Sequence, residues 1–77
     1  DQVFARYAEK EKILTLTCTA PGNPDVEYAL VDLTGRVHAE GHFRNSCTLG
    51  TESMPKGLCL LRLKVNGNFL INKIVLP

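Results

Sequence analysis

The chain has 77 residues, of which 44% are hydrophobic and 22% are charged, a composition typical of one small globular domain and not of a disordered segment. Nine Lys and Arg residues stand against eight Asp and Glu residues, and the net charge of +1 supplies no basic field for nucleic acid or an anionic membrane surface. No apolar run approaches the roughly 20 residues of a membrane-spanning helix. The start at Asp1 does not begin a signal peptide. We therefore expect residues 1–77 to be a single domain cut from a longer protein.

Alternation of apolar and polar residues predicts strands along almost the whole chain. The one helix-compatible stretch, residues 7–12, is too short and has no apolar stripe. Turn formers separate the alternating segments at regular intervals, which is typical of a compact antiparallel sandwich. We predict an all-β fold, an immunoglobulin-like β-sandwich of six to seven short strands, with a small closed barrel as the alternative. The predicted strands are residues 2–7, 13–18, 26–32, 37–43, 46–49, 58–65 and 69–76.

The alternation also predicts which residues face the core. Every second residue of a half-buried strand points to the same face, so the apolar set marks the buried side. The expected inward sets are Leu14, Leu16 and Cys18; Val26, Tyr28 and Leu30; and Cys59, Leu61, Leu63 and Val65.

The last predicted strand follows a tight turn and carries apolar residues on both faces. Asn66-Gly67 between two alternating runs predicts a two-residue type I′ hairpin turn. Beyond it, Phe69 and Ile71 share one face and the apolar residues at 74 and 76 share the other. This change of phase predicts a bulge near residues 72–73, or a strand that is covered on both faces.

Three cysteines, Cys18, Cys47 and Cys59, leave one over if any pair forms. Buried free thiols are the expected state of all three. In an oxidising compartment Cys18 and Cys59 are placed to bridge the two sheets, which is the alternative, and Cys47 would then remain unpaired.

Catalytic and ligand-binding patterns are absent from the sequence. His38 and His42 share a strand face but lie about 13 Å apart, too far to hold one metal ion, so they are read as surface residues. No cysteine–histidine pair, glycine-rich phosphate loop or aromatic platform emerges from the spacing. We expect no enzyme activity, no cofactor, no metal, no nucleic acid partner and no small-molecule substrate.

Three blocks nevertheless carry a family resemblance. Residues 32–37 read DLTGRV, residues 54–58 read MPKGL, and the glycine of the last hairpin is followed by KIV at residues 73–75. In order and spacing these blocks resemble the C-terminal sorting domain of cargo proteins of the type IX (Por) secretion system. The resemblance covers about residues 26–77. The chain departs from the family pattern at Cys59, where the family usually has an aromatic residue, and it lacks the usual upstream Pro-Asn-Pro.

The resemblance implies an immunoglobulin-type sandwich that catalyses nothing and acts as a C-terminal secretion signal. Such domains direct their cargo, including virulence factors such as proteases and adhesins, from the periplasm across the outer membrane. The implied partners are the type IX translocon and outer-membrane shuttle and sortase proteins, and the cargo ends on the cell surface or is secreted after sortase cleavage. The alternative is an immunoglobulin- or fibronectin-like extracellular interaction or spacer module.

The resemblance also assigns roles to residues. An apolar terminal strand reached through a tight hairpin offers an edge to a partner sheet, and exchange of this strand between copies would give a strand-swapped homodimer. Phe69 and Ile71 are expected to anchor the strand. The turns of the motif are Asp32, Gly35, Arg36, Gly57, Asn66 and Gly67, and the residues expected to be recognised by the translocon are Lys73, Ile74, Val75, Leu76 and Pro77.

Overall fold

The computed structural model describes residues 2–77, and within them it contains seven strands and no helix. The described residues accordingly include no helix long and apolar enough to cross a membrane. The strands are β1 (Val3–Ala8), β2 (Ile13–Cys18), β3 (Val26–Asp32), β4 (Val37–Phe43), β5 (Ser46–Gly50), β6 (Gly57–Val65) and β7 (Asn68–Leu76).

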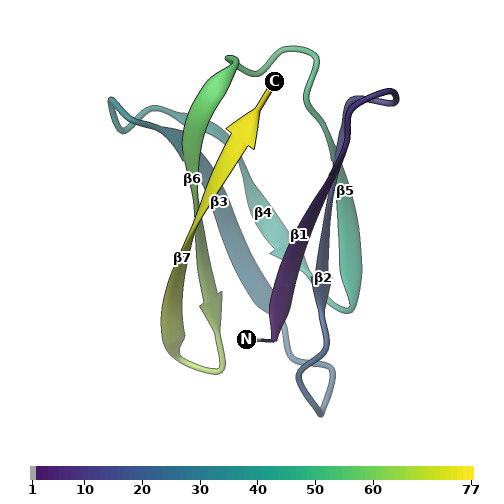
Figure 1. Cartoon of the computed structure of the whole chain (residues 1–77). Helices are drawn as coiled ribbons and strands as arrows, with labels where there is room; N and C mark the ends of the chain where they lie inside the picture. The colour runs from purple at the N-terminus through teal and green to yellow at the C-terminus, as the bar shows by residue number, and fades with distance from the viewer. Residues whose placement is uncertain (1) are drawn as a thin grey trace.

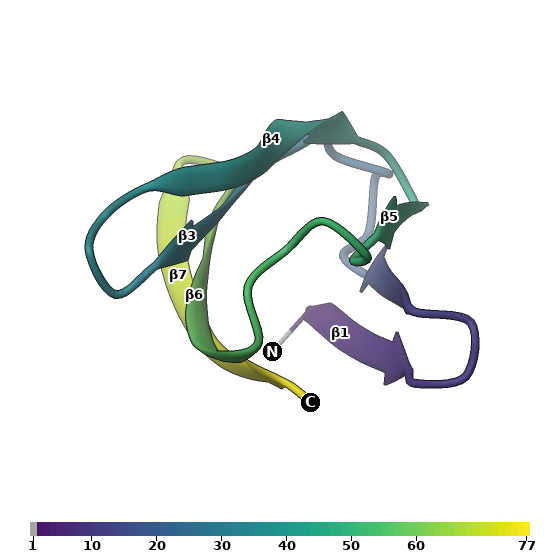
Figure 2. The same cartoon turned by 90° about the horizontal axis from the view of Figure 1, so that it is seen from above.

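The strands form two antiparallel sheets that face each other (Figure 1). One sheet has three strands in the order β1-β2-β5, and the other has four in the order β4-β3-β6-β7. The chain crosses between the sheets after β2, β4 and β5, which gives the connectivity of an immunoglobulin-like sandwich. Seen from above, the two sheets enclose the interior between them (Figure 2). The predicted all-β sandwich of six to seven short strands is confirmed, and the number of strands is seven.

The core lies between the inner faces of the two sheets. The most deeply buried side chains include Leu14 and Leu16 of β2 and Leu61 and Leu63 of β6, each at most 2% exposed. The residues that alternate with them along each strand lie on the outer face of their sheet. Of the residues predicted to face inward, only Tyr28 is less than fully buried, and its ring packs against Phe43 with the ring centroids 6.0 Å apart. The period-two pattern therefore identified most of the core correctly.

In β7 the alternation is regular, and the predicted bulge near residues 72–73 is wrong. The register runs without interruption from the pair Val65–Asn68 to the pair Gly57–Leu76. Phe69, Ile71 and Val75 are 76%, 64% and 67% exposed, so the outer face of the strand is uncovered as well. The sequence suggested a change of phase because this edge strand carries apolar residues on its solvent face.

The irregularity in this sheet lies instead in β4. Leu30 pairs with Ala39, but the next residue, Val31, pairs with Val37, so His38 is the extra residue of a β-bulge. After the bulge Val31 lies on the outer face of the sheet between Val37 and Leu60, and it is only 5% exposed. A bulge at an edge strand disturbs the row of groups to which another strand would bind.

The three cysteines are free, so the alternative bridge between Cys18 and Cys59 is not formed. Cys18 and Cys59 are buried. The Cys59 thiol donates a hydrogen bond to the carbonyl oxygen of Ile74, with 3.5 Å between the sulfur and the oxygen. Burial raises the pKa of the Cys59 thiol and of the partly buried Cys47 thiol. Cys18 and Cys59 are the buried free thiols that were expected, whereas Cys47 is a free thiol that is only partly buried.

Candidate recognition site at the free edge of β7

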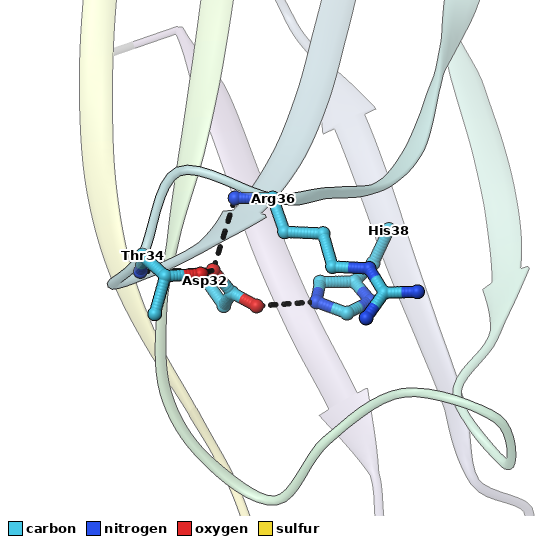
Figure 3. Close-up of polar contacts among 4 residues, drawn as sticks. All are labelled: Asp32, Thr34, Arg36 and His38. Carbon is cyan, nitrogen blue, oxygen red and sulfur yellow. Dashed lines mark hydrogen bonds and ion pairs between the residues drawn. The ribbon is translucent and has the colours of Figure 1, made fainter.

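The turn between β3 and β4 is organised by the Asp32 carboxylate (Figure 3). Its Oδ1 atom accepts hydrogen bonds from the Thr34 hydroxyl at 2.6 Å, the Thr34 amide at 2.9 Å and the Arg36 amide at 3.0 Å. Its Oδ2 atom lies 2.8 Å from Nε2 of His38, the bulged residue. Gly35 adopts a φ of +89°, which only glycine reaches without strain, and its amide donates to the Asp32 carbonyl at 3.0 Å. The spacing Asp-x-x-Gly-Arg is thus that of a self-contained turn.

These contacts change the acidity of Asp32. The hydrogen bond from the Thr34 side chain, followed by that from His38 and those from the backbone, lowers the pKa of the Asp32 carboxyl far below its usual range. The carboxylate is therefore charged at every physiological pH. Arg36 contributes its backbone amide to the turn, and its side chain is exposed.

All three blocks of the family resemblance lie in the four-stranded sheet or in the connections that lead into its strands. The pairs Asp32–Cys59 and Gly57–Leu76 place the Asp32 turn, the start of β6 and the end of β7 at one end of this sheet. The turn of Asn66 and Gly67 lies at the opposite end (Figure 1). Both of its residues have positive φ, 51° and 79°, and this confirms the predicted type I′ turn. The motif turns therefore mark both ends of one sheet instead of gathering at a single point.

The five residues expected to be recognised divide between the core and the surface. Ile74 and Leu76 are 9% and 4% exposed and belong to the core, whereas Lys73, Val75 and Pro77 are exposed. A partner can reach the first two side chains only if β7 leaves the sheet. Ile74 and Leu76 thus hold the strand in place, and the exposed residues remain available for contact.

The two residues expected to anchor the strand, Phe69 and Ile71, do not pack into the core. Both lie on the outer face of β7 and are among the most exposed large hydrophobic residues in the described part of the chain. The ammonium group of Lys64 lies 5.4 Å from the centre of the Phe69 ring, a cation–π contact on the surface. Burial of β7 instead comes from Ile74 and Leu76, so the anchoring role given to Phe69 and Ile71 is corrected.

The backbone of β7 has a free edge. Because residues 66–67 form a two-residue turn, Val65 and Asn68 make a hydrogen-bonded pair, and the bonding then alternates along the strand. Even-numbered residues of β7 direct their amide and carbonyl groups to β6, and odd-numbered residues direct theirs away from the sheet. We call the odd-numbered residues the edge row: Phe69, Ile71, Lys73 and Val75.

Among the four edge strands, β7 is the least protected against pairing with another strand. β1 and β5 have six and five residues, and β4 is interrupted by its bulge and carries charged or titratable side chains on its outer face. β7 has nine residues, no bulge and a single charge, Lys73. Short length, bulges and charges are the usual means of preventing strand addition. The edge row of β7 is therefore the best candidate for a binding site in this fold.

A shallow groove lies beside this edge. It has a volume of about 650 Å³ and separates β7 from β1, the edge strand of the other sheet. Its walls include Phe4, Ile71 and Lys73, and its deeper lining includes the core residues Leu14 and Ile74. An extended segment bound to β7 would lie along this groove.

The two histidines have separate acidic partners. His38 contacts Asp32, and Nδ1 of His42 lies 2.8 Å from the Asp25 carboxylate, whose hydrogen bond raises the pKa of His42. Within residues 2–77 no three histidine, cysteine or acidic side chains come together as metal ligands. The contact between His38 and Asp32 was not predicted from the sequence, because the alternation of apolar and polar residues does not indicate the bulge that places His38 there.

Neither a family model nor a curated protein matches the chain. The features that point to a function are the three sequence blocks, their position in or beside one sheet, and the free edge of β7.

Proposed function

We propose that this protein is a non-catalytic C-terminal sorting domain that directs a cargo protein through the type IX secretion system. The observation that carries the proposal is the unprotected nine-residue edge of β7. Support also comes from the three blocks that resemble the family, since each of them lies in the sheet that ends in this strand or in a connection that leads into it. On this proposal the domain passes through the periplasm, and its cargo is released or attached at the cell surface after a sortase removes the domain.

Recognition on this proposal proceeds by strand addition. A strand of the translocon hydrogen-bonds to the outward amide and carbonyl groups of the edge row, as in other complexes that extend a sheet. Lys73 and Val75 present their side chains to the partner. Ile74 and Leu76 keep β7 in the sheet and so maintain the geometry of its edge.

An export assay tests the sorting role. Residues 1–77 are fused behind a signal peptide and a fluorescent reporter, and expressed in a bacterium with a type IX system and in a matched strain without it. We expect the reporter at the surface or in the medium of the first strain only. Retention of a folded fusion in the periplasm of both strains would contradict the sorting role and favour the extracellular interaction module.

A proline substitution in the same fusion tests the edge of β7. Ile71→Pro removes an amide that points away from β6, so the sheet keeps its own hydrogen bonds, as edge strands permit. We expect Ile71→Pro to reduce export at least tenfold, whereas Ile71→Ala, which retains the amide, is exported normally. Thermal unfolding of both purified variants is the control for folding. Full export of folded Ile71→Pro would rule out recognition through this edge.

Deletion of residues 72–77 is a less specific test. It removes Ile74 and Leu76 from the core together with the edge, so we expect the domain to unfold as export stops. The proline variant separates these two effects.

A further inference from the structure

The charges of the protein are divided unevenly along the chain. Residues 53–77 contain no Asp or Glu at all. The same segment contains four cations, which are Lys56, Arg62, Lys64 and Lys73. The terminal hairpin is therefore basic although the whole protein is almost neutral.

The fold turns this division into a gradient across the outer face of the four-stranded sheet. The acidic residues of that face, Glu27 and Glu40, lie on β3 and β4, and its cations Arg62, Lys64 and Lys73 lie on β6 and β7. The free edge of β7 is thus at the positive side of the sheet, and the bulged edge of β4 is at the negative side.

Two of the three cations have no acidic partner among the described residues. Lys64 lies 3.9 Å from the Glu27 carboxylate, but no described carboxylate lies within 4.0 Å of Arg62 or Lys73. Lys73 belongs to the edge row itself. Arg62 is diagonal to it on β6, because Arg62 pairs with Ile71 and Lys73 pairs with Leu60. A strand added to β7 would place its outer face next to Lys73, with Arg62 one strand farther away on β6.

The inner face of an added strand meets a different environment. It would point into the groove between β1 and β7, whose lining includes the apolar side chains of Val3, Leu14 and Ile74. Opposite charges across neighbouring strands are favourable, and apolar pairs are favourable on the buried face. The surroundings of the β7 edge therefore favour a particular kind of side chain on each face of the partner strand.

We infer that the strand taken up by β7 is apolar on the face that enters the groove and carries an acidic residue opposite Lys73 on its outer face. The inference rests on the proposed function for the identity of the partner as a strand of the translocon. A second copy of this chain is a poorer partner, because its own terminal hairpin is equally basic and would bring Arg62, Lys64 and Lys73 of both copies together.

Two synthetic peptides test the inference with the isolated protein. Each has nine residues, with valine at the four even positions and threonine at the odd ones, except for a central glutamate in one peptide and a central lysine in the other. Binding of fluorescently labelled peptide is measured by anisotropy at low and at high salt. We expect the glutamate peptide to bind about two- to fivefold more tightly at low salt, as for an exposed ion pair, and the preference to fade at high salt.

Charge reversal in the protein identifies the contact. Lys73→Glu, on the exposed face, should reverse the preference so that the lysine peptide binds more tightly. Lys10→Glu changes the net charge equally but lies in the turn between β1 and β2, and it should leave the preference intact. Sedimentation of the protein without peptide shows whether a second copy occupies the edge.

The results separate the inference from the proposed function. Equal binding of both peptides, a preference that Lys73→Glu does not reverse, binding of neither peptide, or a stable homodimer in place of peptide binding would each overturn the inference. Peptide preference together with failed export would leave the acidic-strand specificity standing and remove the sorting role. Export without any peptide preference would support the sorting role and remove the acidic-strand specificity.

Discussion

Asp32 is the residue on which the turn between β3 and β4 depends. One of its carboxylate oxygens accepts three hydrogen bonds, and the other contacts His38, so a single side chain joins the turn to the bulge in β4. These bonds favour the charged form and hold the pKa of Asp32 below its value in the unfolded chain. A depressed pKa contributes stability above the unfolded pKa and loses it as the pH falls toward the folded pKa.

Asp32→Asn tests this linkage because the amide keeps the shape and most acceptor capacity of the carboxylate. We expect the variant to be less stable than the native protein above about pH 4, near the unfolded carboxyl pKa, and the difference to shrink progressively below it. Urea unfolding at a series of pH values measures the difference. Asp32→Ala, which loses the acceptor as well, should remain less stable at every pH. A constant difference for Asp32→Asn between pH 7 and pH 2 would disprove the linkage.

At the scale of the element, β7 shows which features the alternation of apolar and polar residues predicts and which it does not. The strand itself and its turn followed from the sequence, because Asn-Gly between two alternating runs leaves little choice. Its inner face was harder to identify, because Phe69, Ile71 and Val75 are as apolar as Ile74 and Leu76. Alternation defines two faces, but only the packing of the other sheet decides which one is buried.

The candidate site was predictable only in part for the same reason. The choice of β7 as the recognition element came from the sequence, and so did the Asp32 turn. The bulge at His38, which protects the opposite edge, left no trace in the pattern of β4. The division of residues 73–77 into core and surface residues also required the register with β6.

Two isoleucines on β7 test the observed faces directly. Ile74→Ala removes a buried side chain, and we expect it to lower the free energy of unfolding by about 2–4 kcal/mol. Ile71→Ala removes the same atoms from a side chain that is 64% exposed, and its effect should stay within about 0.5 kcal/mol. Chemical denaturation measures both. A larger loss at position 71 than at position 74 would show that the strand is turned over.

At the scale of the whole molecule, the sandwich is held together without covalent cross-links between its described residues. Its core joins both sheets through side chains such as Leu16 and Leu61, and Cys18 and Cys59 belong to it as free thiols. A domain of this size buries only about 60% of the surface of its unfolded chain, so its stability depends closely on this packing.

Thiol reactivity reports on the state of the whole domain. Alkylation proceeds through the thiolate, which burial disfavours at Cys47 and Cys59. We expect slow reaction of native protein at neutral pH, first at the partly buried Cys47, and rapid reaction at all three cysteines in denaturant. Mass spectrometry counts the modified sites. A mass two hydrogens lower without reductant, or an unfolding midpoint that reductant shifts, would reveal a disulfide instead.

The strand order β4-β3-β6-β7 has a consequence for the timing of folding. The hairpins β3–β4 and β6–β7 join neighbours in the chain and can form within about 1–10 μs. The pairing of β3 with β6 spans β4 and β5, and such non-local pairing makes all-β domains fold slowly. Until the β6–β7 hairpin has docked, the edge of β3 that pairs with β6 has no partner strand. The four-stranded sheet is complete only when the β6–β7 hairpin has joined the β3–β4 hairpin, so the edge of β7 takes its place beside the other sheet at that step.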